Sequence, residues 1–238
     1  MVKISILTYV YVTKTNNRLV MLKESIKSVI DQGFADYEHI IVDDGSEVDV
    51  EAWLKKNAFP KIRYIKNKHT GIRFSAEPER TCLRNAKGQY AILLPSDDLQ
   101  MKGCLKKLSD YLDNHPKCIA VTGACVWSYG KKRRIVQRKD DPNKTLITKN
   151  TVHGCTTMFR TSVLEKIDLP EDETGFAADY DLWLKISEHG KIHRVKDIVL
   201  IYRKHKDATR IITMPDKKYR AKCLNFVLGN AKKRRGLI

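Results

Sequence analysis

The chain has no long apolar run. Its longest apolar stretches, such as residues 119–127, are far too short to span a bilayer, which argues against a membrane-spanning helix. A strand-like segment begins directly after Met1, so we expect no cleaved signal peptide. Internal repeats, segments of disordered composition and linkers rich in Pro, Gly or Ser are also missing. With 238 residues and 42% apolar side chains, the sequence predicts a folded protein with a substantial core.

Closely spaced cysteine pairs are missing as well. No CxxC pair is present, and most of the six cysteines lie inside apolar segments: Cys82, Cys104, Cys118, Cys125, Cys155 and Cys223. This pattern is typical of a reduced, intracellular protein and argues against a structural zinc site.

Acidic residues are too few to balance the basic ones. There are 45 Lys and Arg against 28 Asp and Glu, so the net charge is +17 and a polyanionic partner is expected. The excess is concentrated at residues 131–134 and at residues 217–238, which hold eight Lys or Arg and no acid. Nucleic acid, an anionic membrane surface and phosphorylated substrates are the candidate partners.

The arrangement of the basic residues disfavours nucleic acid. They are not interleaved with aromatic residues, and no RNA- or DNA-binding motif is present. We interpret the C-terminal cluster as a contact with anionic lipid headgroups, with an ordinary solvated basic face as the alternative. The expected location is therefore cytoplasmic, with peripheral contact on the inner face of the membrane.

Strand-like and helix-like segments alternate along the chain. Apolar runs bounded by polar turns predict strands at 2–8, 39–42, 62–65, 90–94, 119–126 and 198–202. Apolar residues at helical spacing predict helices at 19–30, 50–56, 105–112, 181–186 and 217–231. Residues 130–149 are interpreted as a charged loop. The alternation predicts an α/β fold with a largely parallel sheet and helices on both faces.

Two of the expected strands end in paired carboxylates. Asp43 and Asp44 follow the strand 39–42, and Asp97 and Asp98 follow the strand 90–94. Ligands of open α/β sheets bind beyond the carboxyl ends of the strands, so both turns are expected at one edge. Adjacent carboxylates repel each other and tolerate burial only with a cation, a metal ion or several donors. An N-cap pair before the next helix is the alternative for Asp97 and Asp98.

Several segments in order resemble the inverting nucleotide-sugar glycosyltransferases of family 2, which have the GT-A fold. They read "SILTY", "HIIVDDGS", "AKGQYAILLPSDD", "TTMFRTSVLEKI", "AADYDLWLKISEHG" and "YRKH". The resemblance implies a single Rossmann-like GT-A domain at residues 1–207, with a nucleotide-binding half (1–100) and an acceptor half (101–207). A basic C-terminal helix or tail would follow at residues 208–238.

The resemblance also implies a metal site. In this family a DXD-type motif holds a divalent cation against the two phosphates of the donor, and Ser96-Asp97-Asp98 matches it with serine in the first position. Asp98 is thus the expected ligand of Mn²⁺ or Mg²⁺, and Asp97 is expected to reach the ribose or a metal-bound water. His205, in "YRKH", matches a histidine that completes the metal shell or contacts the diphosphate. A surface histidine is the alternative.

Nucleotide contacts follow from the same resemblance. Asp44 matches the residue that binds the base, with Asp43 supporting the turn, although a simple Asp-Asp-Gly turn is the alternative. Thr8 and Tyr9 match the end of the first strand, where an aromatic ring can stack on the base. The usual Asn of this segment is Val10 here, so the identity of the base stays open.

The remaining implied residues concern the diphosphate and the acceptor. Arg80 can pair with the diphosphate, with Arg84 as an equal rival and an exposed helical arginine as the alternative. Asp179 falls on the family's general base, which takes the proton of the acceptor hydroxyl. Asp181 and His153 are expected on the acceptor side, and a solvated helical acid is the alternative for Asp181.

The expected function is therefore an inverting, metal-dependent glycosyltransferase of the hexosyltransferase type. Its donor would be a nucleoside-diphosphate sugar, with a UDP-sugar favoured, and its acceptor a glycan or lipid-linked hydroxyl, as in polysaccharide biosynthesis. A sugar-nucleotide transferase or pyrophosphorylase is one alternative, but the segment "TYVYVTKTNNR" lacks the glycine-rich signature of those enzymes. A basic nucleic-acid-binding protein is the other.

Overall fold

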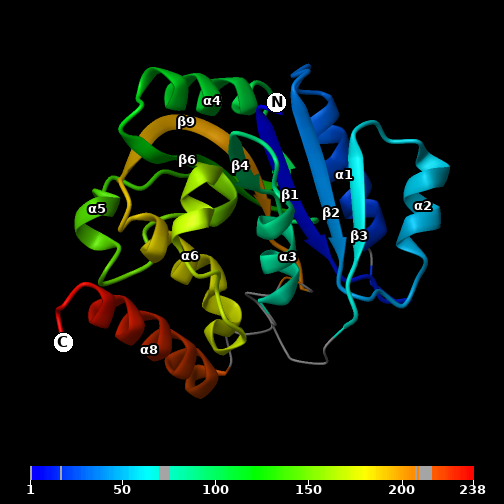
Figure 1. Ribbon diagram of the computed structural model, residues 1–238. Helices are drawn as coiled ribbons and strands as arrows, with labels where there is room; N and C mark the ends of the chain where they lie inside the picture. The colour runs from blue at the N-terminus through cyan, green and yellow to red at the C-terminus, as the bar shows by residue number, and fades with distance from the viewer. Residues whose placement is uncertain (1, 17, 70–75, 207, 209–215) are drawn as a thin grey trace.

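The computed structural model describes residues 2–16, 18–69, 76–206, 208 and 216–238. Within these residues a nine-stranded sheet has the order β3-β2-β1-β4-β8-β6-β9-β5, and β7 pairs with β6 beside this path. Figure 1 shows the sheet crossing the molecule with helices packed on both faces. The α/β fold expected from the sequence is confirmed.

The first half of the chain forms four parallel strands. These are β1 (Ile4–Val10), β2 (Tyr37–Asp43), β3 (Ile62–Lys66) and β4 (Tyr90–Leu93). The helices that connect them are α1 (Arg18–Ile30), α2 (Val50–Asn57) and α3 (Glu77–Asn85). Because all four strands run the same way, both acidic turns lie at the same edge of the sheet, as the sequence predicts.

The second half adds antiparallel strands to the sheet. Its strands are β5 (Leu99–Gln100), β6 (Cys118–Tyr129), β7 (Lys132–Val136), β8 (Thr157–Arg160) and β9 (Lys191–Arg203). Its helices are α4 (Cys104–Asn114), α5 (Pro142–Thr145), η1 (Gly154–Thr156), η2 (Thr161–Lys166), η3 (Asp172–Ala177), α6 (Ala178–Ile186) and α8 (Lys217–Arg234). Strand β8 is antiparallel to both β4 and β6 and joins the two halves of the sheet.

Alternate residues of the strands face two different layers of helices. In β1, Ile6 packs with α4, whereas its neighbour Leu7 packs with α3, α6 and α8. Helix α1 covers the first of these faces through Leu22 and Ile26, which are fully buried. The central strands β1 and β4 are therefore mostly apolar, because both of their faces are covered.

The interpretation of residues 130–149 as a loop is wrong in part. Strand β7 pairs antiparallel with the end of β6, with Tyr129 opposite Lys132, and α5 follows. Gly130 occupies the turn with φ +54°, a conformation that residues other than glycine rarely adopt. Strand β7 has no apolar alternation because it is an exposed edge strand held by its backbone.

Helix α8 is part of the fold rather than a free tail. Its buried residues Cys223, Val227 and Ala231 join the core that contains Trp183 of α6. At its end, Arg234 and Arg235 both contact Glu188, at 3.1 and 3.3 Å. No helix among the described residues is both long and apolar enough to cross a bilayer.

Candidate active site

The turn after β2 is built around Asp43. Its Oδ1 accepts hydrogen bonds from the backbone N–H and hydroxyl of Ser46, at 2.8 and 2.5 Å, and its Oδ2 accepts one from the Tyr64 hydroxyl at 2.7 Å. Gly45 follows with φ +71°, and a Cβ there would lie 2.7 Å from the backbone nitrogen of His69. Asp43 therefore fixes the turn, as expected.

Asp44 faces the opposite way and forms one side of a small aromatic platform. Its Oδ2 lies 3.0 Å from Nδ1 of His69, and the His69 ring stacks on Tyr11 with centroids 4.6 Å apart. Its Oδ1 is buried and has no hydrogen-bond partner among the described residues. The carboxylate and the stacked rings together offer a hydrogen-bond acceptor beside flat apolar surfaces, the features that a nucleobase needs.

The two residues at the end of β1 have different environments. Thr8 is fully buried, donates to the Leu94 carbonyl at 2.8 Å and lies 2.9 Å from His39. It holds β1 to β4 and contributes no open surface. The Tyr9 side chain is 43% exposed at the edge of the sheet. Reduced hydration and the nearby carboxylates of Glu79 and Asp179 raise the pKa of its phenol well above the usual value.

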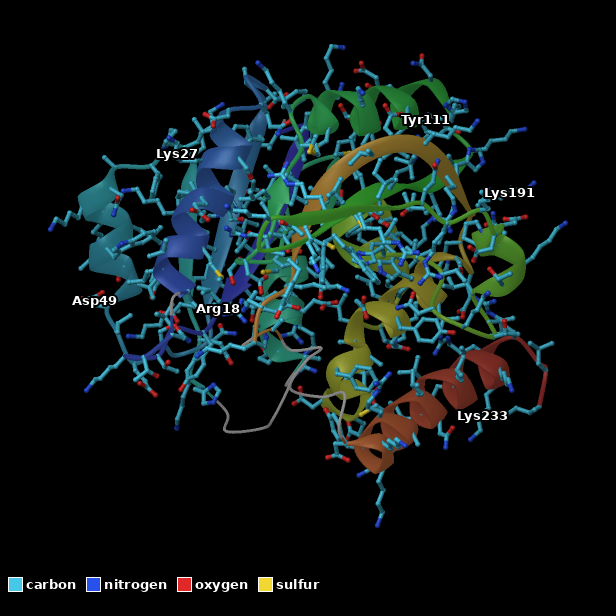
Figure 2. All side chains as sticks on the ribbon, turned by 180° about the vertical axis from the view of Figure 1, so that it is seen from behind. Arg18, Lys27, Asp49, Tyr111, Lys191 and Lys233 are labelled. Carbon is cyan, nitrogen blue, oxygen red and sulfur yellow. The ribbon has the colours of Figure 1, made fainter. Side chains whose placement is uncertain are left out.

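Asp97 lies between the side chains of Arg18 and His205. Its Oδ2 is 2.5 Å from Nη1 of Arg18 and 2.8 Å from Nε2 of His205. Burial alone would raise the pKa of Asp97, but the hydrogen bond with His205 and the charge of Arg18 outweigh burial and lower it. Figure 2 shows Arg18 at the start of α1, at the edge of the sheet. The structure thus brings Asp97 and His205 together and adds Arg18.

Asp98 is buried and only half satisfied. Its Oδ1 accepts a hydrogen bond from the backbone nitrogen of Arg203 at 2.8 Å, whereas its Oδ2 has no partner among the described residues. Burial, with the adjacent charge of Asp97, raises the pKa of Asp98 well above its usual value. Since an unpaired buried carboxylate is costly, this oxygen fits a site that a cation completes.

The side chains around Asp98 offer few ligands of their own to a divalent cation. Among the residues that the structure describes, no cluster of three or more His, Cys, Asp and Glu side chains could hold a metal ion. Mg²⁺ needs no such cluster, because it is commonly held by one or two carboxylates together with substrate phosphates and water. The Oδ2 of Asp98, which has no partner among the described residues, fits a cation that a diphosphate completes. Nδ1 of His205 is likewise buried and without a partner in the described part of the chain.

Asp179 lies in the first turn of α6, against the backbone of η1. A Cβ added to Gly154 would be 3.3 Å from Oδ2 of Asp179, so a larger residue there would crowd the carboxylate. Burial raises the pKa of Asp179 to about 6, so the carboxylate is ionised at neutral pH but remains a competent proton acceptor. The charges of Asp98 and Asp179 both raise the pKa of the Cys155 thiol, after burial itself, which indicates that both acids lie near it.

Glu79 is a site residue that the sequence did not single out. It is 4% exposed, and its Oε1 has no hydrogen-bond partner among the described residues. Burial, followed by the charges of Asp179 and Asp181, raises its pKa to about 8. At neutral pH Glu79 is therefore a neutral acid beside an ionised base. His69 and Tyr11 were also missed, because nothing local in the sequence shows that they meet Asp44.

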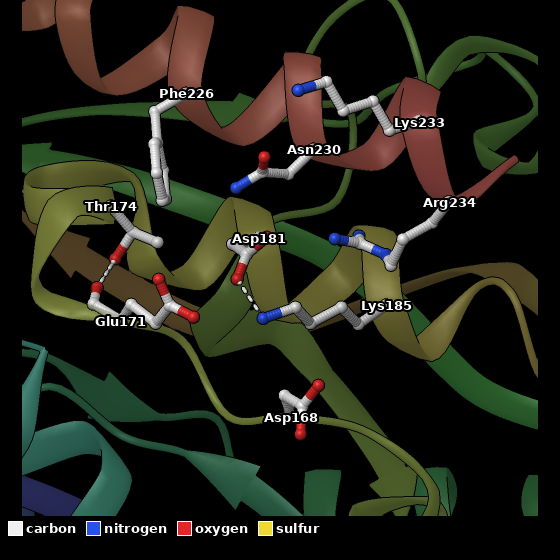
Figure 3. A pocket seen from close by; sticks show the side chains of 9 residues that line it. All are labelled: Asp168, Glu171, Thr174, Asp181, Lys185, Phe226, Asn230, Lys233 and Arg234. Atoms are coloured by element: carbon white, nitrogen blue, oxygen red, sulfur yellow. Dashed lines mark hydrogen bonds and ion pairs between the residues drawn. The ribbon is translucent and has the colours of Figure 1, made fainter. Parts of the chain in front are cut away.

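Asp181 points away from Asp179 and lines a separate cavity. It is 3% exposed, and its Oδ2 lies 2.6 Å from Nζ of Lys185. Figure 3 shows this pair beside Lys233 and Arg234 of α8, in a cavity of about 220 Å³. The carboxylate of Asp181 is therefore paired with the ammonium group of Lys185.

The other expected residues are spread more widely. Arg80 pairs with Glu77 at 2.6 Å and with Asp172 at 3.2 Å, on the outer side of α3. Arg84 contacts the same Glu77 at 3.4 Å. His153 precedes η1 and is adjacent to the glycine that packs on Asp179. The structure therefore places His153 beside Gly154, and Arg80 between two acids.

Comparisons with known proteins give the same fold and family. A fragment of TarS of S. aureus, solved with UDP-GlcNAc, matches with a TM-score of 0.71 at 20% identity, over 87% of this chain and 60% of that one. A mannosyltransferase of Pyrobaculum calidifontis, solved with GDP-Man and Mn²⁺, matches with a TM-score of 0.65 at 18% identity, over 95% of this chain and 64% of that one. These likenesses show the expected GT-A fold.

Sequence relatives are closer. EpsE of Bacillus subtilis (strain 168), provisionally named a glycosyltransferase, is 31% identical over 71% of this chain and 63% of its own length. An uncharacterized glycosyltransferase of Rickettsia prowazekii is 24% identical over 77% of this chain, which spans 60% of that relative. The family model described as "Glycosyl transferase family 2" matches residues 11–168. Because this match covers more than half of the chain, the protein belongs to glycosyl transferase family 2.

Proposed function

We propose that the protein transfers a sugar from a nucleoside-diphosphate sugar to a hydroxyl group of a glycan or a lipid-linked acceptor. The reaction would proceed with inversion and with Mn²⁺ or Mg²⁺. The observation that carries this proposal is the pairing of two acids with different properties near one thiol. Asp98 has an unpaired buried oxygen suited to a cation, and Asp179 is a half-buried carboxylate with a pKa of about 6.

In the proposed reaction Asp179 accepts the proton of the acceptor hydroxyl. The hydroxyl oxygen forms a bond to the anomeric carbon of the donor, and the bond from that carbon to the diphosphate oxygen breaks. The bonding electrons leave with the nucleoside diphosphate. A divalent cation at Asp98, when bound, would supply Lewis-acid stabilisation of the charge on that leaving group. A single displacement inverts the configuration.

On the donor side, Asp44, Tyr9 and Asp97 have proposed roles. Asp44, with the His69–Tyr11 stack, would bind the base, and Tyr9 would cover the sugar or base from the end of β1. Arg18 and His205 keep Asp97 ionised, so that it can accept a hydrogen bond from a ribose hydroxyl. One solved structural neighbour binds UDP-GlcNAc and another GDP-Man, so likeness does not choose the base. We favour UDP on the resemblance of the Asp44 segment alone.

The test is nucleotide binding measured by thermal shift. UDP, GDP and dTDP are added with and without Mn²⁺, because a ligand that binds only the folded state raises the melting temperature. We expect one nucleotide to give a Mn²⁺-dependent rise that Asp98→Ala abolishes. Asp110→Ala serves as control, since Asp110 is an exposed acid paired with Lys106 on α4. An equal rise in wild type and Asp98→Ala would exclude Asp98 as the metal ligand.

A sugar-nucleotide pyrophosphorylase would bind the same nucleotides, so binding alone does not separate it from a transferase. The products do. A transferase releases nucleoside diphosphate, whereas a pyrophosphorylase consumes pyrophosphate and releases the nucleoside triphosphate. We expect only the diphosphate.

A further inference from the structure

A row of aromatic side chains leads outward from Asp179. The backbone of Gly154 packs on Asp179, and the neighbouring His153 meets the Tyr202 ring edge to face, with centroids 5.5 Å apart. The Tyr202 ring lies 6.4 Å from the Trp127 ring. The row therefore runs from beside Asp179 to the far end of β6.

The row continues into the hairpin of β6 and β7. Trp127 is opposite Tyr202 on β9 and opposite Arg134 on β7, and residues directly opposite each other on paired strands project to the same face. Tyr129 is opposite Lys132 and is 67% exposed. Aromatic rings and basic side chains thus share one face of this part of the sheet.

Three cations lie along this face. Nζ of Lys204 is 3.6 Å from the centroid of the Trp127 ring, and Lys132 and Arg134 are exposed on β7. Among the described residues, no ion pair involves Lys132, Arg134 or Lys204. The positive charge along the aromatic row is therefore not neutralised by the protein itself.

This combination has a definite chemical preference. The apolar C–H faces of sugar rings pack against aromatic rings, and arginine binds phosphate oxygens with two parallel hydrogen bonds. We propose that this face binds the acceptor, and that the acceptor is a glycan carrying phosphate groups. Its reactive hydroxyl would lie at Asp179, its next sugars would follow the row past Tyr202 and Trp127 to the exposed ring of Tyr129, and a phosphate would lie at Arg134. The inference rests on the proposed transferase function, because it assigns the acceptor of that site.

The strand β7 offers a matched pair of variants. Arg133 and Arg134 are adjacent, exposed and equal in charge, but successive residues of a strand face opposite sides. Binding of phosphorylated dextran and of the unmodified dextran is measured by calorimetry. We expect wild type to prefer the phosphorylated form, Arg134→Ala to lose about tenfold in affinity for it, and Arg133→Ala to stay within about twofold. Tyr129→Ala, which removes the exposed ring of this face, should weaken both dextrans by about fivefold.

Three results would overturn the inference. They are equal losses in Arg133→Ala and Arg134→Ala, no preference of wild type for the phosphorylated form, or a loss in Arg134→Ala that appears only with phosphatidylglycerol vesicles. The last would make the hairpin a lipid contact, whereas a phosphate held within the glycan gives the loss without any lipid. The Mn²⁺-dependent nucleotide shift is measured on the same variants. If that shift is kept while the two arginines behave alike, only the acceptor inference fails; if wild type shows no shift, the transferase proposal fails.

Discussion

At the scale of single residues, four carboxylates in two adjacent pairs have four different environments. Both carboxylate oxygens of Asp43 accept hydrogen bonds, from Ser46 and Tyr64. Asp44 contacts His69, and its other oxygen has no partner among the described residues. Asp97 lies between Arg18 and His205, and Asp98 is buried with one unpaired oxygen. Like charges in sequence are therefore tolerable because one member of each pair is satisfied by the protein and the other can serve a ligand.

Glu79 gives a prediction on stability and pH. Its pKa is raised from 4.5 to about 8, so the folded protein binds this proton more tightly than the unfolded chain. The free energy of unfolding must then fall as the pH rises from 4.5 to 8, since the unfolded state releases the proton first. Glu79→Gln removes this loss. Melting temperatures of wild type and variant should diverge in favour of the variant between pH 5 and pH 8, and a constant difference would contradict the burial of Glu79.

The residues also show what a sequence can predict of this site. The paired acids predicted that both acidic turns lie at one edge of the sheet, because the strands before them run in the same direction. The partners Arg18 and His69 could not be predicted, since each comes from a distant segment, whereas the resemblance did point to His205. The resemblance pointed to Arg80, which pairs with Glu77 and Asp172, but not to Glu79, which the phase of α3 turns inward. Only packing determines that phase.

At the scale of elements, α6 carries two acids with separate tasks. Asp179 faces η1, whereas Asp181, two residues on, pairs with Lys185 in the cavity beneath α8. Two residues along a helix correspond to a rotation of about 200°, so the two side chains must project in different directions. Strand β7, by contrast, was not predictable from apolar pattern, because its cationic residues are exposed and only its backbone pairs with β6.

The Asp181–Lys185 pair gives a prediction on stability. Both side chains are buried, at 4% and 10% exposure, so Asp181→Ala leaves an unpaired ammonium group inside the fold. We expect a loss of about 3 kcal/mol in the free energy of unfolding. The double variant Asp181→Leu, Lys185→Met removes both charges and should recover most of it. Urea unfolding measures both values, and equal losses in the single and double variants would contradict this account.

At the scale of the whole molecule, part of the net charge of +17 lies on exposed residues at the end of α8. Two of the four basic residues that end α8 are engaged by Glu188, but Lys232 and Lys233 are exposed and project from the helix surface. Figure 2 shows Lys233 near the C-terminal end of α8. We propose that these lysines contact anionic lipid headgroups.

The lipid proposal predicts binding to acidic vesicles. Lys232→Gln with Lys233→Gln keeps both contacts of Glu188 and removes two charges, each worth on the order of 1 kcal/mol at an anionic surface. Sedimentation with phosphatidylglycerol vesicles at low salt should fall by at least about tenfold in partition coefficient, and salt should weaken wild-type binding. Lys106→Gln with Lys107→Gln on α4 is the control for charge alone. Equal partition of both double variants would return the C-terminal cluster to an ordinary solvated surface.

The central claim is that Asp179 is the base of a single inverting displacement. It is tested most directly by turnover and product configuration in Asp179→Asn, using the nucleotide sugar selected by the thermal-shift screen. The asparagine keeps the shape but accepts no proton, so turnover should fall roughly 10²–10⁴-fold while Mn²⁺-dependent nucleotide binding is kept. Wild-type activity should rise through pH 6 as Asp179 ionises, and NMR of the product should show the inverted anomer. Retained configuration, or near-normal turnover in Asp179→Asn, would contradict the account.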